Sequence, residues 1–354
     1  SFGGPAYPSM IAEIENQTPD EPVPVDMTRL DALLDSKMIE YYDAEALYQN
    51  QLKQSFDWKA IRDSGITVGY DAMYGAGQDV MRDLFPTATL LHCEHNPSFE
   101  GQAPEPIARN LSNFQHSIKA KGIQFGLATD GDADRIGLFD QNADFVDSHH
   151  ILLLLVHYLH KYKAMKGKVV CTFSVTSKLK TLCDHYGIEL QVTKIGFKYI
   201  GEIMANETVL VGGEESGGIA VAGHIPERDG IYIGLTLLEF MAETGKTLPE
   251  LIQEVYDIVG SFKMGRNDLH IAEDKKWQVM DGCKAGDFKQ FGDYKVESVE
   301  DIDGYKFHLG DDRWVMIRPS GTEPVLRVYA EADNDDRVAD ILKQALAAIE
   351  DYAG

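Results

Sequence analysis

The sequence has few cysteines, few basic residues for its length and no long hydrophobic run. Only four of its 354 residues are cysteines (Cys93, Cys171, Cys183 and Cys283), and no Cys-x-x-Cys spacing occurs among them. This scatter argues against a disulfide framework and against a cysteine-based zinc site. We therefore expect buried thiols in a cytoplasmic protein.

Hydrophobic residues never form a run long enough to cross a bilayer. The longest run, Ile151–Val156, is far shorter than the roughly 20 residues that a spanning helix needs, and no signal peptide is recognisable. Lysine and arginine together number 33, against 57 aspartates and glutamates, which gives a formal net charge of −24. This charge disfavours nucleic acids and anionic membranes as partners, so an anionic ligand requires a local basic cluster.

The segment that predicts the chemistry is Thr129–Arg135, which reads Thr-Asp-Gly-Asp-Ala-Asp-Arg. Asp130, Asp132 and Asp134 occupy alternate positions, and Gly131 lets the chain curl so that their carboxylates converge. Clustered carboxylates repel one another unless a cation lies among them. Because oxygen ligands favour hard cations, the pattern predicts a site for Mg²⁺, Ca²⁺ or Mn²⁺.

A solvated turn is the simpler interpretation of the same segment. An EF-hand loop begins with the same spacing but requires Gly and Glu at its sixth and twelfth positions, where this chain has Arg135 and Gln141. An arginine beside the carboxylates indicates instead an anion shared between a cation and a guanidinium. The apolar runs Phe125–Ala128 and Ile136–Phe139 predict buried strands that put the turn at a sheet edge.

Alternating helix and strand patterns predict two successive α/β domains with mixed, mainly parallel sheets sandwiched by helices. A C-terminal α+β domain with an antiparallel sheet follows. The expected boundaries are 1–27 for an irregular remnant and linker, 28–147, 148–260 and 261–354. The expected helices include 31–51, 78–84, 107–121, 149–164, 177–186, 198–206, 230–244 and 335–352.

A glycine-rich turn, Gly212–Gly218, reads Gly-Gly-Glu-Glu-Ser-Gly-Gly and follows the expected strand Val209–Val211. Its glycines free the backbone for close approach to a ligand. Glu214 and Ser216 offer a carboxylate and a hydroxyl, which suit the vicinal hydroxyls of a sugar. A plain surface turn is the alternative, although two carboxylates there would add repulsion for no structural gain.

A second candidate binding turn, Arg318–Arg327, reads Arg-Pro-Ser-Gly-Thr-Glu-Pro-Val-Leu-Arg. Its Ser-Gly-Thr stretch can turn hydroxyls and backbone N–H groups toward an anion, and the two arginines supply charge-assisted donors. It is not a Walker loop, because no Gly-Lys-Ser/Thr follows. A hairpin loop with incidental arginines is the alternative.

Two further segments carry weaker signals. Lys198 follows Gly196-Phe197 at a strand-to-helix turn, and His224–Gly230 places a histidine, an arginine and two acids before a helix. The histidine pairs at 149–150 and 157–160 have no acid partner in register on their helix. We expect these histidines to serve packing rather than zinc binding.

Three of these motifs, Asp-Gly-Asp-Ala-Asp-Arg, Gly-Glu-Glu-Ser-Gly and Arg-Pro-Ser-Gly-Thr-Glu-Pro, occur in an order and at intervals that resemble the α-D-phosphohexomutase superfamily. This superfamily includes phosphoglucomutase and phosphomannomutase. The stretch at 71–77, Asp-Ala-Met-Tyr-Gly-Ala-Gly, is similar to a further family motif. The resemblance implies a four-domain architecture, three α/β domains and one α+β domain, of which this chain resembles the last three.

The resemblance also implies an activity. Family members interconvert hexose 1-phosphates and 6-phosphates through a phosphoserine enzyme and a 1,6-bisphosphate intermediate. Gly-Glu-Glu-Ser resembles the loops of glucose-preferring members, so the implied hexose is glucose. The implied partners are a hexose phosphate and Mg²⁺, and the oligomeric state stays open.

Roles follow residue by residue from the resemblance. Mg²⁺ would be bound by Asp130, Asp132 and Asp134. Residues implied to bind the sugar or to line the substrate cleft are Glu214, Ser216, Lys198, His224 and Arg228. The phosphate that is not transferred would be held by Arg318, Ser320, Gly321, Thr322 and Arg327. The implied catalytic residues are Arg135, Arg228 and Lys198. Arg228 falls where relatives often carry a lysine proposed as general acid/base; because a guanidinium is a poor proton donor, we expect it to bind phosphate instead.

One family motif is not found in the sequence. The phosphoserine loop, Thr-Ala-Ser-His-Asn-Pro in many relatives, is absent from the chain, and Ser1–Pro8 resembles the stretch that follows it. We therefore expect no mutase turnover from this chain alone, with the N-terminal domain of the same protein as its missing partner. A non-catalytic sugar-phosphate-binding or regulatory protein is the alternative. A hydrolase of the haloacid-dehalogenase kind is disfavoured, because it would leave the sugar and phosphate turns unused.

Overall fold

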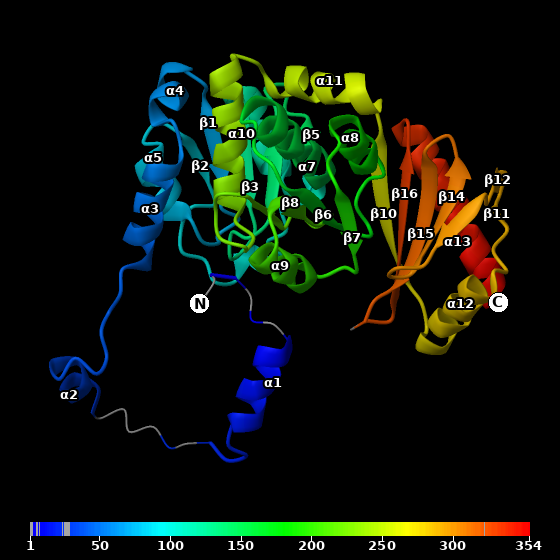
Figure 1. The fold of residues 1–354 in the computed structure, drawn as a ribbon, viewed down its shortest axis with the longest axis horizontal. Coiled ribbons are helices and arrows are strands. Elements are labelled where there is room, and N and C mark those ends of the chain that lie inside the picture. Colours follow the sequence, from blue (N-terminus) through cyan, green and yellow to red (C-terminus); the bar gives the residue numbers. More distant parts are fainter. Residues whose placement is uncertain (1–2, 5, 7, 23, 25–28, 322) are drawn as a thin grey trace.

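The fold is that of a computed structural model, which describes residues 3–4, 6, 8–22, 24, 29–321 and 323–354 (Figure 1). The described residues form a body of three units, each built on a sheet of its own, and an N-terminal arm that runs outside this body. The expected irregular region 1–27 falls partly outside the described residues. Its described part includes a helix, α1 (Pro8–Gln17).

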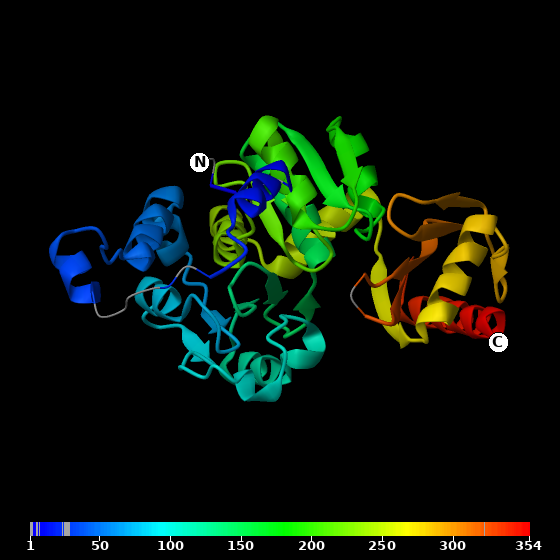
Figure 2. The same ribbon diagram turned by 90° about the horizontal axis from the view of Figure 1, so that it is seen from below.

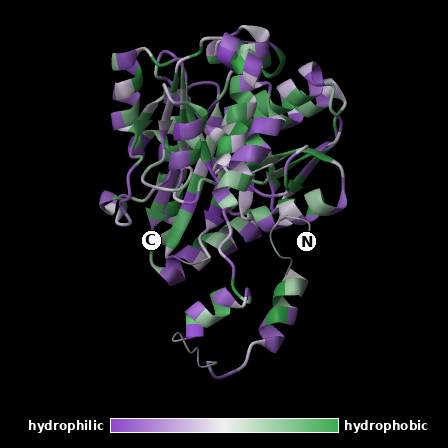
Figure 3. Cartoon of the chain, turned by 90° about the vertical axis from the view of Figure 1, so that its left-hand side faces the viewer, coloured by the Kyte–Doolittle hydropathy of each residue, from purple (hydrophilic) through white to green (hydrophobic). Residues whose placement is uncertain are grey.

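The arm shows where a sequence-based expectation is wrong. Instead of one helix over 31–51, the chain forms α2 (Leu30–Asp35) and, after a break, α3 (Ala44–Ser55). Asp43 restarts the helix because its side chain accepts a hydrogen bond from the N–H of Ala46 at 2.9 Å. Figure 3 shows α1 and α2 lying apart from the body, and Ile14 on α1 is 63% exposed.

The first unit carries a mixed five-stranded sheet in the order β2-β1-β3-β4-β5. Its strands are β1 (Val68–Asp71), β2 (Thr89–Leu91), β3 (Phe125–Thr129), β4 (Ile136–Phe139) and β5 (Phe145–Val146). Strand β1 pairs in parallel with β2 and β3, whereas β4 pairs antiparallel with β3 and β5. The helices that follow α3 in this unit are α4 (Trp58–Asp63), α5 (Gln78–Leu84) and α6 (Ser112–Lys121), with 3₁₀ turns at Phe99–Gly101 and Ala108–Asn110.

The second unit has a four-stranded sheet in the order β7-β6-β8-β9, in which only β9 runs antiparallel to its neighbour. Its strands are β6 (Lys168–Thr172), β7 (Leu190–Thr193), β8 (Val209–Gly213) and β9 (Ile219–Val221). Its helices are α7 (Ser148–His157), which continues as a π-helical turn at Tyr158–Tyr162, α8 (Lys178–Tyr186), α9 (Phe197–Asn206), α10 (Gly230–Thr244) and α11 (Leu248–Val259).

The first two units share one hydrophobic core. Helix α10 packs against β3 and β4 of the first sheet and against β9 of the second. A single buried cluster accordingly extends from Leu52 on α3 to Phe262 beyond α11. This shared core fixes the two sheets, and the turns at their edges, relative to each other.

The third unit has a wholly antiparallel five-stranded sheet in the order β10-β16-β15-β14-β13. Its strands are β10 (Lys263–His270), β13 (Ser298–Glu300), β14 (Tyr305–Gly310), β15 (Arg313–Pro319) and β16 (Val325–Ala332), beside a small hairpin of β11 (Gln290–Phe291) and β12 (Tyr294–Lys295). Figure 2 shows α12 (Glu273–Ala285) and α13 (Asp335–Ala353) beside this sheet, and both contact β15 and β16. The predicted fold class is therefore confirmed.

His150 and His157 on α7 each have an acidic partner and a tyrosine partner, and His150 also stacks on Phe262. That these histidines serve packing rather than zinc binding stays a prediction. His150 lies 2.7 Å from Asp147 through Nδ1 and 2.7 Å from the hydroxyl of Tyr256 through Nε2. His157 lies 3.0 Å from Glu254 and 2.7 Å from the hydroxyl of Tyr186. Within the part of the chain that the structure describes, no helix is both long and apolar enough to span a membrane.

The shared core predicts that Leu152→Ala is strongly destabilising. Leu152 on α7 is 0% exposed and packs directly over Gly213 at the end of β8. Truncating it leaves a cavity that the two sheets cannot close, so we expect a loss of about 2–5 kcal/mol in the free energy of unfolding. Urea unfolding followed by circular dichroism measures this loss.

Leu47→Ala is the matched control. Leu47 on α3 is 59% exposed, and its truncation should change the free energy of unfolding by no more than about 0.5 kcal/mol. Equal effects of the two substitutions would contradict the assignment of α7 to the core.

Candidate active site

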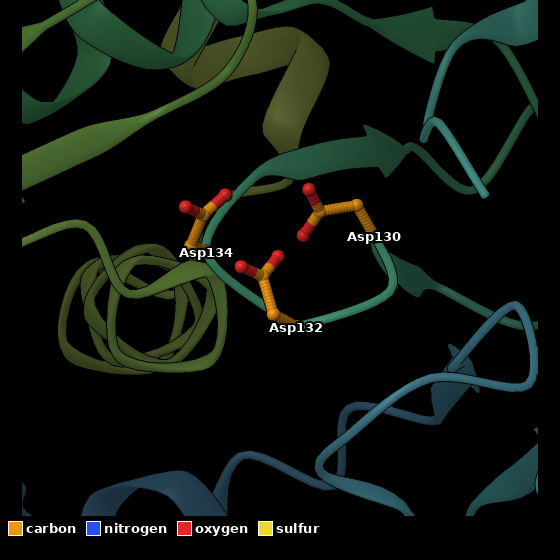
Figure 4. Close-up of side chains that lie close together, drawn as sticks. All are labelled: Asp130, Asp132 and Asp134. Atoms are coloured by element: carbon orange, nitrogen blue, oxygen red, sulfur yellow. The ribbon is translucent and has the colours of Figure 1, made fainter. Parts of the chain in front are cut away.

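The carboxylate turn, residues 130–135, connects the antiparallel strands β3 and β4 at the sheet edge. Thr129 and Ile136 are paired across the turn, and Ala133 adopts the left-handed conformation with φ 61°. Figure 4 shows the side chains of Asp130, Asp132 and Asp134 pointing toward one another, and an oxygen from each lies within 4.8 Å of the others. The curl that the sequence predicted thus brings the three carboxylates together.

The turn at residues 71–77, which follows β1, contacts the backbone of the carboxylate turn. The N–H of Ala76 donates to the carbonyl of Gly131 at 3.0 Å. A Cβ on Gly75 would lie 2.6 Å from the carbonyl oxygens of Asp130 and Gly131, so only glycine allows this approach. The Asp-Ala-Met-Tyr-Gly-Ala-Gly stretch therefore packs against the backbone of the carboxylate turn and fixes its position.

The electrostatics of the turn fit a bound cation. The pKa of Asp130 is raised to about 6, mainly by burial and also by the charges of Asp134 and Asp132, while Arg135 opposes the rise. Burial likewise raises the pKa of Asp134. Oδ1 of Asp134 is buried and has no hydrogen-bond partner among the described residues. Three converging carboxylates with an unpaired oxygen suit a hard divalent cation.

Two arginines reach the carboxylate turn. Nε of Arg135 lies 3.2 Å from Oδ2 of Asp130 and 3.8 Å from Oδ1 of Asp134. Nη2 of Arg228 lies 2.8 Å from Oδ2 of Asp134, and its guanidinium lies 5.3 Å from the centre of the Phe197 ring. Both predicted cationic residues therefore lie beside the candidate metal ligands.

The sugar turn, residues 214–218, is joined to the carboxylate turn by backbone contacts. The turn connects β8 and β9, and Gly218 forms an antiparallel bridge with Arg135. The N–H of Ile136 donates to the carbonyl of Gly217 at 3.2 Å. The two turns are thus held at van der Waals distance by the backbone itself.

The two predicted sugar ligands differ in exposure. Glu214 is 7% exposed, and its carboxylate accepts a hydrogen bond from the N–H of Gly196 at 3.0 Å. Burial raises the pKa of Glu214, while Arg228 and Arg135 lower it. Ser216 is exposed and lines a cavity of about 170 Å³.

The remaining predicted cleft residues lie near the same turns. Lys198 is exposed in the first turn of α9, beside the Gly196 that binds Glu214. His224 lies 2.9 Å from Asp229 through Nε2, and its ring stacks on Tyr232 at 3.9 Å. A cavity of about 640 Å³, lined by Asp132, Arg228 and Asp229 among others, opens beside the carboxylate turn. This cavity offers room for a ligand against the cation site.

The phosphate turn, residues 319–324, connects β15 and β16 in the third unit. Arg318 and Arg327 are directly opposite each other across the two strands. Like charges in this position repel, and neither Nε atom has a hydrogen-bond partner among the described residues. Such a pair suits an anion that accepts from both side chains.

The backbone of the phosphate turn is held by a buried lysine. Lys276 is 3% exposed, and its Nζ donates to the carbonyls of Ser320 at 3.1 Å and Glu323 at 3.2 Å. Ser320 is buried, whereas a Cβ on Gly321 would meet no atom within 4 Å. Thr322 lies outside the described residues.

The phosphate turn faces the second unit. Asp303 lies 3.3 Å from Nε of Arg318 and accepts a hydrogen bond from the N–H of Ile195 at 2.9 Å, so it links the third unit to the second. The carboxylate and sugar turns thus meet between the first and second units, and Arg318 at the start of the phosphate turn is linked to the second unit through Asp303.

Some residues of this junction are missing from the sequence-based set. Asp229, Lys276 and Asp303 each hold a predicted site residue through a side-chain contact or through a backbone carbonyl. Only Asp229 carries a sequence signal, since it precedes α10 as an N-cap whose side chain accepts from the N–H of Tyr232. No local sequence pattern indicates that Lys276 would contact the phosphate turn or that Asp303 would contact Arg318.

Comparisons with known proteins agree with this arrangement. Models of the phosphoglucomutase/phosphomannomutase family match three successive regions: alpha/beta/alpha domain II at residues 46–143, alpha/beta/alpha domain III at 147–259 and the C-terminal domain at 270–348. Together these matches cover most of the chain.

Individual relatives agree with the family matches. A phosphoglucomutase/phosphomannomutase of Thermococcus kodakarensis is 29% identical over 86% of this chain, which spans 65% of that protein. A phosphoglucosamine mutase of Methanococcus aeolicus is 34% identical over 72% of this chain, which spans 55% of that protein. The chain therefore spans less than two thirds of the length of these relatives.

A solved structure covers nearly the whole chain. The crystal structure of a Thermus thermophilus protein provisionally named phosphomannomutase superposes with a TM-score of 0.82 at 29% identity, covering 99% of this chain and 73% of the other. Fold, turns and relatives together define a protein of the α-D-phosphohexomutase class. Within that class, the chain belongs to the phosphoglucomutase/phosphomannomutase family and carries its domains II, III and IV.

The carboxylate turn predicts that Mg²⁺ stabilises the chain and that Asp132→Asn removes this effect. A ligand that binds only the folded state stabilises it, by about 2.7 kcal/mol at 100 times its dissociation constant. Without Mg²⁺ the variant should be at least as stable as the parent, because one of three repelling charges is gone. Thermal unfolding with Mg²⁺ and with EDTA measures both effects.

Asp293→Asn is the control for this substitution. Asp293 is exposed between β11 and β12, far from the carboxylate turn in sequence. The control should keep the full Mg²⁺-dependent shift. A parent chain whose midpoint does not respond to millimolar Mg²⁺ would argue against a metal site.

Proposed function

We propose that this chain binds a hexose phosphate together with Mg²⁺ and supplies three of the domains of a phosphohexomutase. The proposed reaction interconverts a hexose 1-phosphate and the 6-phosphate through a phosphoserine enzyme and a 1,6-bisphosphate. The observation that carries the proposal is the backbone bridge between Arg135 and Gly218, which joins the carboxylate turn to the sugar turn. A phosphoryl group beside the cation and a hexose ring at Glu214 can then be part of one ligand.

The cation site has a defined role in this proposal. Mg²⁺ held by Asp130, Asp132 and Asp134 neutralises negative charge on the phosphoryl group that is transferred. Arg135 and Arg228 add fixed positive charge at the same position. The pKa of Arg228 is raised, with Asp134 as the main favourable partner against the effect of burial. Arg228 therefore stays charged and acts by electrostatics rather than as a proton donor.

The other turns would recognise the rest of the ligand. Arg318 and Arg327, with Ser320, Gly321 and Thr322, form the proposed cradle for the phosphate that is not transferred. Glu214 and Ser216 would bind ring hydroxyls, and Lys198 and His224 would line the cleft between these two groups. Lys198 takes part in none of the ion pairs found among the described residues, and its Nζ lies 5.1 Å from the centre of the Tyr199 ring, so its ammonium is available to an anionic ligand.

The hexose itself is a separate question. The relatives are named for phosphoglucomutase/phosphomannomutase and phosphoglucosamine mutase activity. Glucose is our choice from the Gly-Glu-Glu-Ser sequence, and mannose and glucosamine are the competing sugars. Titrations with glucose 6-phosphate, mannose 6-phosphate and glucosamine 6-phosphate would rank them directly.

The proposal predicts that Arg318→Gln weakens binding of glucose 6-phosphate. A charge-assisted hydrogen bond contributes roughly 1.5–3 kcal/mol, so we expect an affinity about 10- to 100-fold lower. Isothermal titration calorimetry in the presence of Mg²⁺ gives the dissociation constants. Arg313→Gln on the same strand is the control, because Arg313 lies at the other end of β15 and pairs with Asp311. Equal losses for the two variants would argue against a specific cradle.

Turnover is a distinct prediction. We expect binding of a hexose phosphate by residues 1–354 without conversion of glucose 1-phosphate to glucose 6-phosphate. A coupled assay for glucose 6-phosphate formation, with glucose 1,6-bisphosphate added as activator, tests it on this chain and on an N-terminally extended form. Robust conversion by this chain would overturn the expectation of inactivity. Binding without conversion by either form would favour the non-catalytic alternative.

A further inference from the structure

The sugar turn has two faces, and only one of them belongs to the site described above. Glu214 points toward the carboxylate turn, where its pKa responds to Arg228 and Arg135. Glu215 points the other way, toward the third unit, where its pKa is raised by burial and lowered by Arg266 and Arg327. Adjacent residues of one turn therefore contact two different units.

Arg266 on β10 is the residue that Glu215 meets. Nη1 of Arg266 lies 3.7 Å from Oε1 of Glu215. The rest of the guanidinium is held by Asp268, which accepts from Nε at 2.8 Å and from Nη2 at 2.7 Å, and it lies 5.7 Å from the centre of the Tyr329 ring. A bidentate pair and an aromatic face leave the side chain little freedom.

Charged residues on neighbouring strands extend from Arg266 to the phosphate turn. Asp268 is directly opposite Arg327 across β10 and β16, and Arg327 is directly opposite Arg318 across β16 and β15. The pKa of Asp268 is lowered first by its hydrogen bond to Arg266, and then by the charges of Arg266 and Arg327. Alternating charges thus connect Glu215 in the sugar turn to Arg327 of the proposed cradle, which lies opposite Arg318.

We propose that Glu215 and Arg266 form a positioning pair that sets the sugar turn relative to the phosphate cradle. This inference rests on the proposed function, in which one hexose phosphate is bound by both. A ligand that spans two units binds tightly only when the units are already at the right separation. The pair acts through Glu214, Ser216 and the cradle arginines, and together with Ser216 it lines the cavity of about 170 Å³.

A double-mutant cycle with Glu215→Gln and Arg266→Gln tests the inference by calorimetric titration with Mg²⁺ present. We expect each single substitution to weaken glucose 6-phosphate binding by about 3- to 10-fold, the range that partly exposed ion pairs can supply. The double variant should bind glucose 6-phosphate no more weakly than the single variant with the larger loss, because the two single substitutions remove the same interaction. Inorganic phosphate, titrated without Mg²⁺ so that the cradle is its binding site, should bind the parent and Glu215→Gln with the same affinity, because this substitution leaves Arg266 paired with Asp268.

Asp312→Asn is the matched control. Asp312 forms an ion pair with Lys178 at 2.8 Å, which joins the same two units away from the sugar turn. Its loss should leave glucose 6-phosphate affinity unchanged. If Arg266→Gln lowers the unfolding midpoint, Glu215→Arg is used in its place. Repulsion between the new arginine and Arg266 should then weaken glucose 6-phosphate binding more than Glu215→Gln does.

The outcomes separate this inference from the proposed function. Additive or absent effects in a parent chain that binds glucose 6-phosphate would overturn the positioning pair and leave the proposed function intact. A parallel loss of inorganic phosphate affinity would also overturn it, because the defect would then lie in the cradle. A parent chain that binds none of the three hexose phosphates would overturn both.

Discussion

The candidate site depends on the close approach of two backbone turns that belong to different sheets. At Gly217 a Cβ would lie 2.7 Å from the carbonyl oxygen of Ile136, and at Gly218 it would lie 2.6 Å from Cδ of Arg228. A side chain at position 217 would therefore separate the sugar turn from the carboxylate turn, and one at position 218 would displace the side chain of Arg228. The sequence suggests that these glycines allow a ligand to approach the backbone. In the structure, Ile136 and Arg228 occupy the space next to them. The shared core under α10 makes this approach possible, because it fixes both sheet edges before any ligand binds.

The second constraint is electrostatic. In a chain of net charge −24, most cations of the junction are paired with an acid: Arg228 with Asp134, Arg318 with Asp303 and Arg266 with Asp268. These acids hold the guanidinium groups in place, and they also oppose the binding of an anion. A phosphorylated ligand therefore gains affinity only where it adds contacts to arginines that keep free donors. Arg327 comes nearest to that condition, since its Nε has no hydrogen-bond partner within the described residues and its ion pair with Glu323 is long, at 3.9 Å.

The local part of this architecture could be predicted from the sequence, and the part that links the units could not. Strand β4 and helices α5 and α10 have the predicted bounds, because apolar runs, glycines and an aspartate N-cap mark them. The expected elements omit α11, although Thr247 and Glu250 form a capping box at its start. Glu215 is a different case. Periodicity shows which residues share a face of one element, but Arg266, which faces Glu215, lies in another unit and carries no local signal.

The size of the junction explains why single ion pairs can matter there. The third unit has a core of its own around Phe291, Phe307 and Val328, separate from the core that the first two units share. A small buried cluster joins it to the second unit, in which Phe173 meets Trp314 and the ammonium of Lys306 lies 4.6 Å and 4.3 Å from their rings. A contact this small fixes an orientation less firmly than a domain core does. The position of the phosphate turn therefore depends on polar contacts at the rim of this cluster. Among those contacts, the one between Glu215 and Arg266 also reaches the sugar turn.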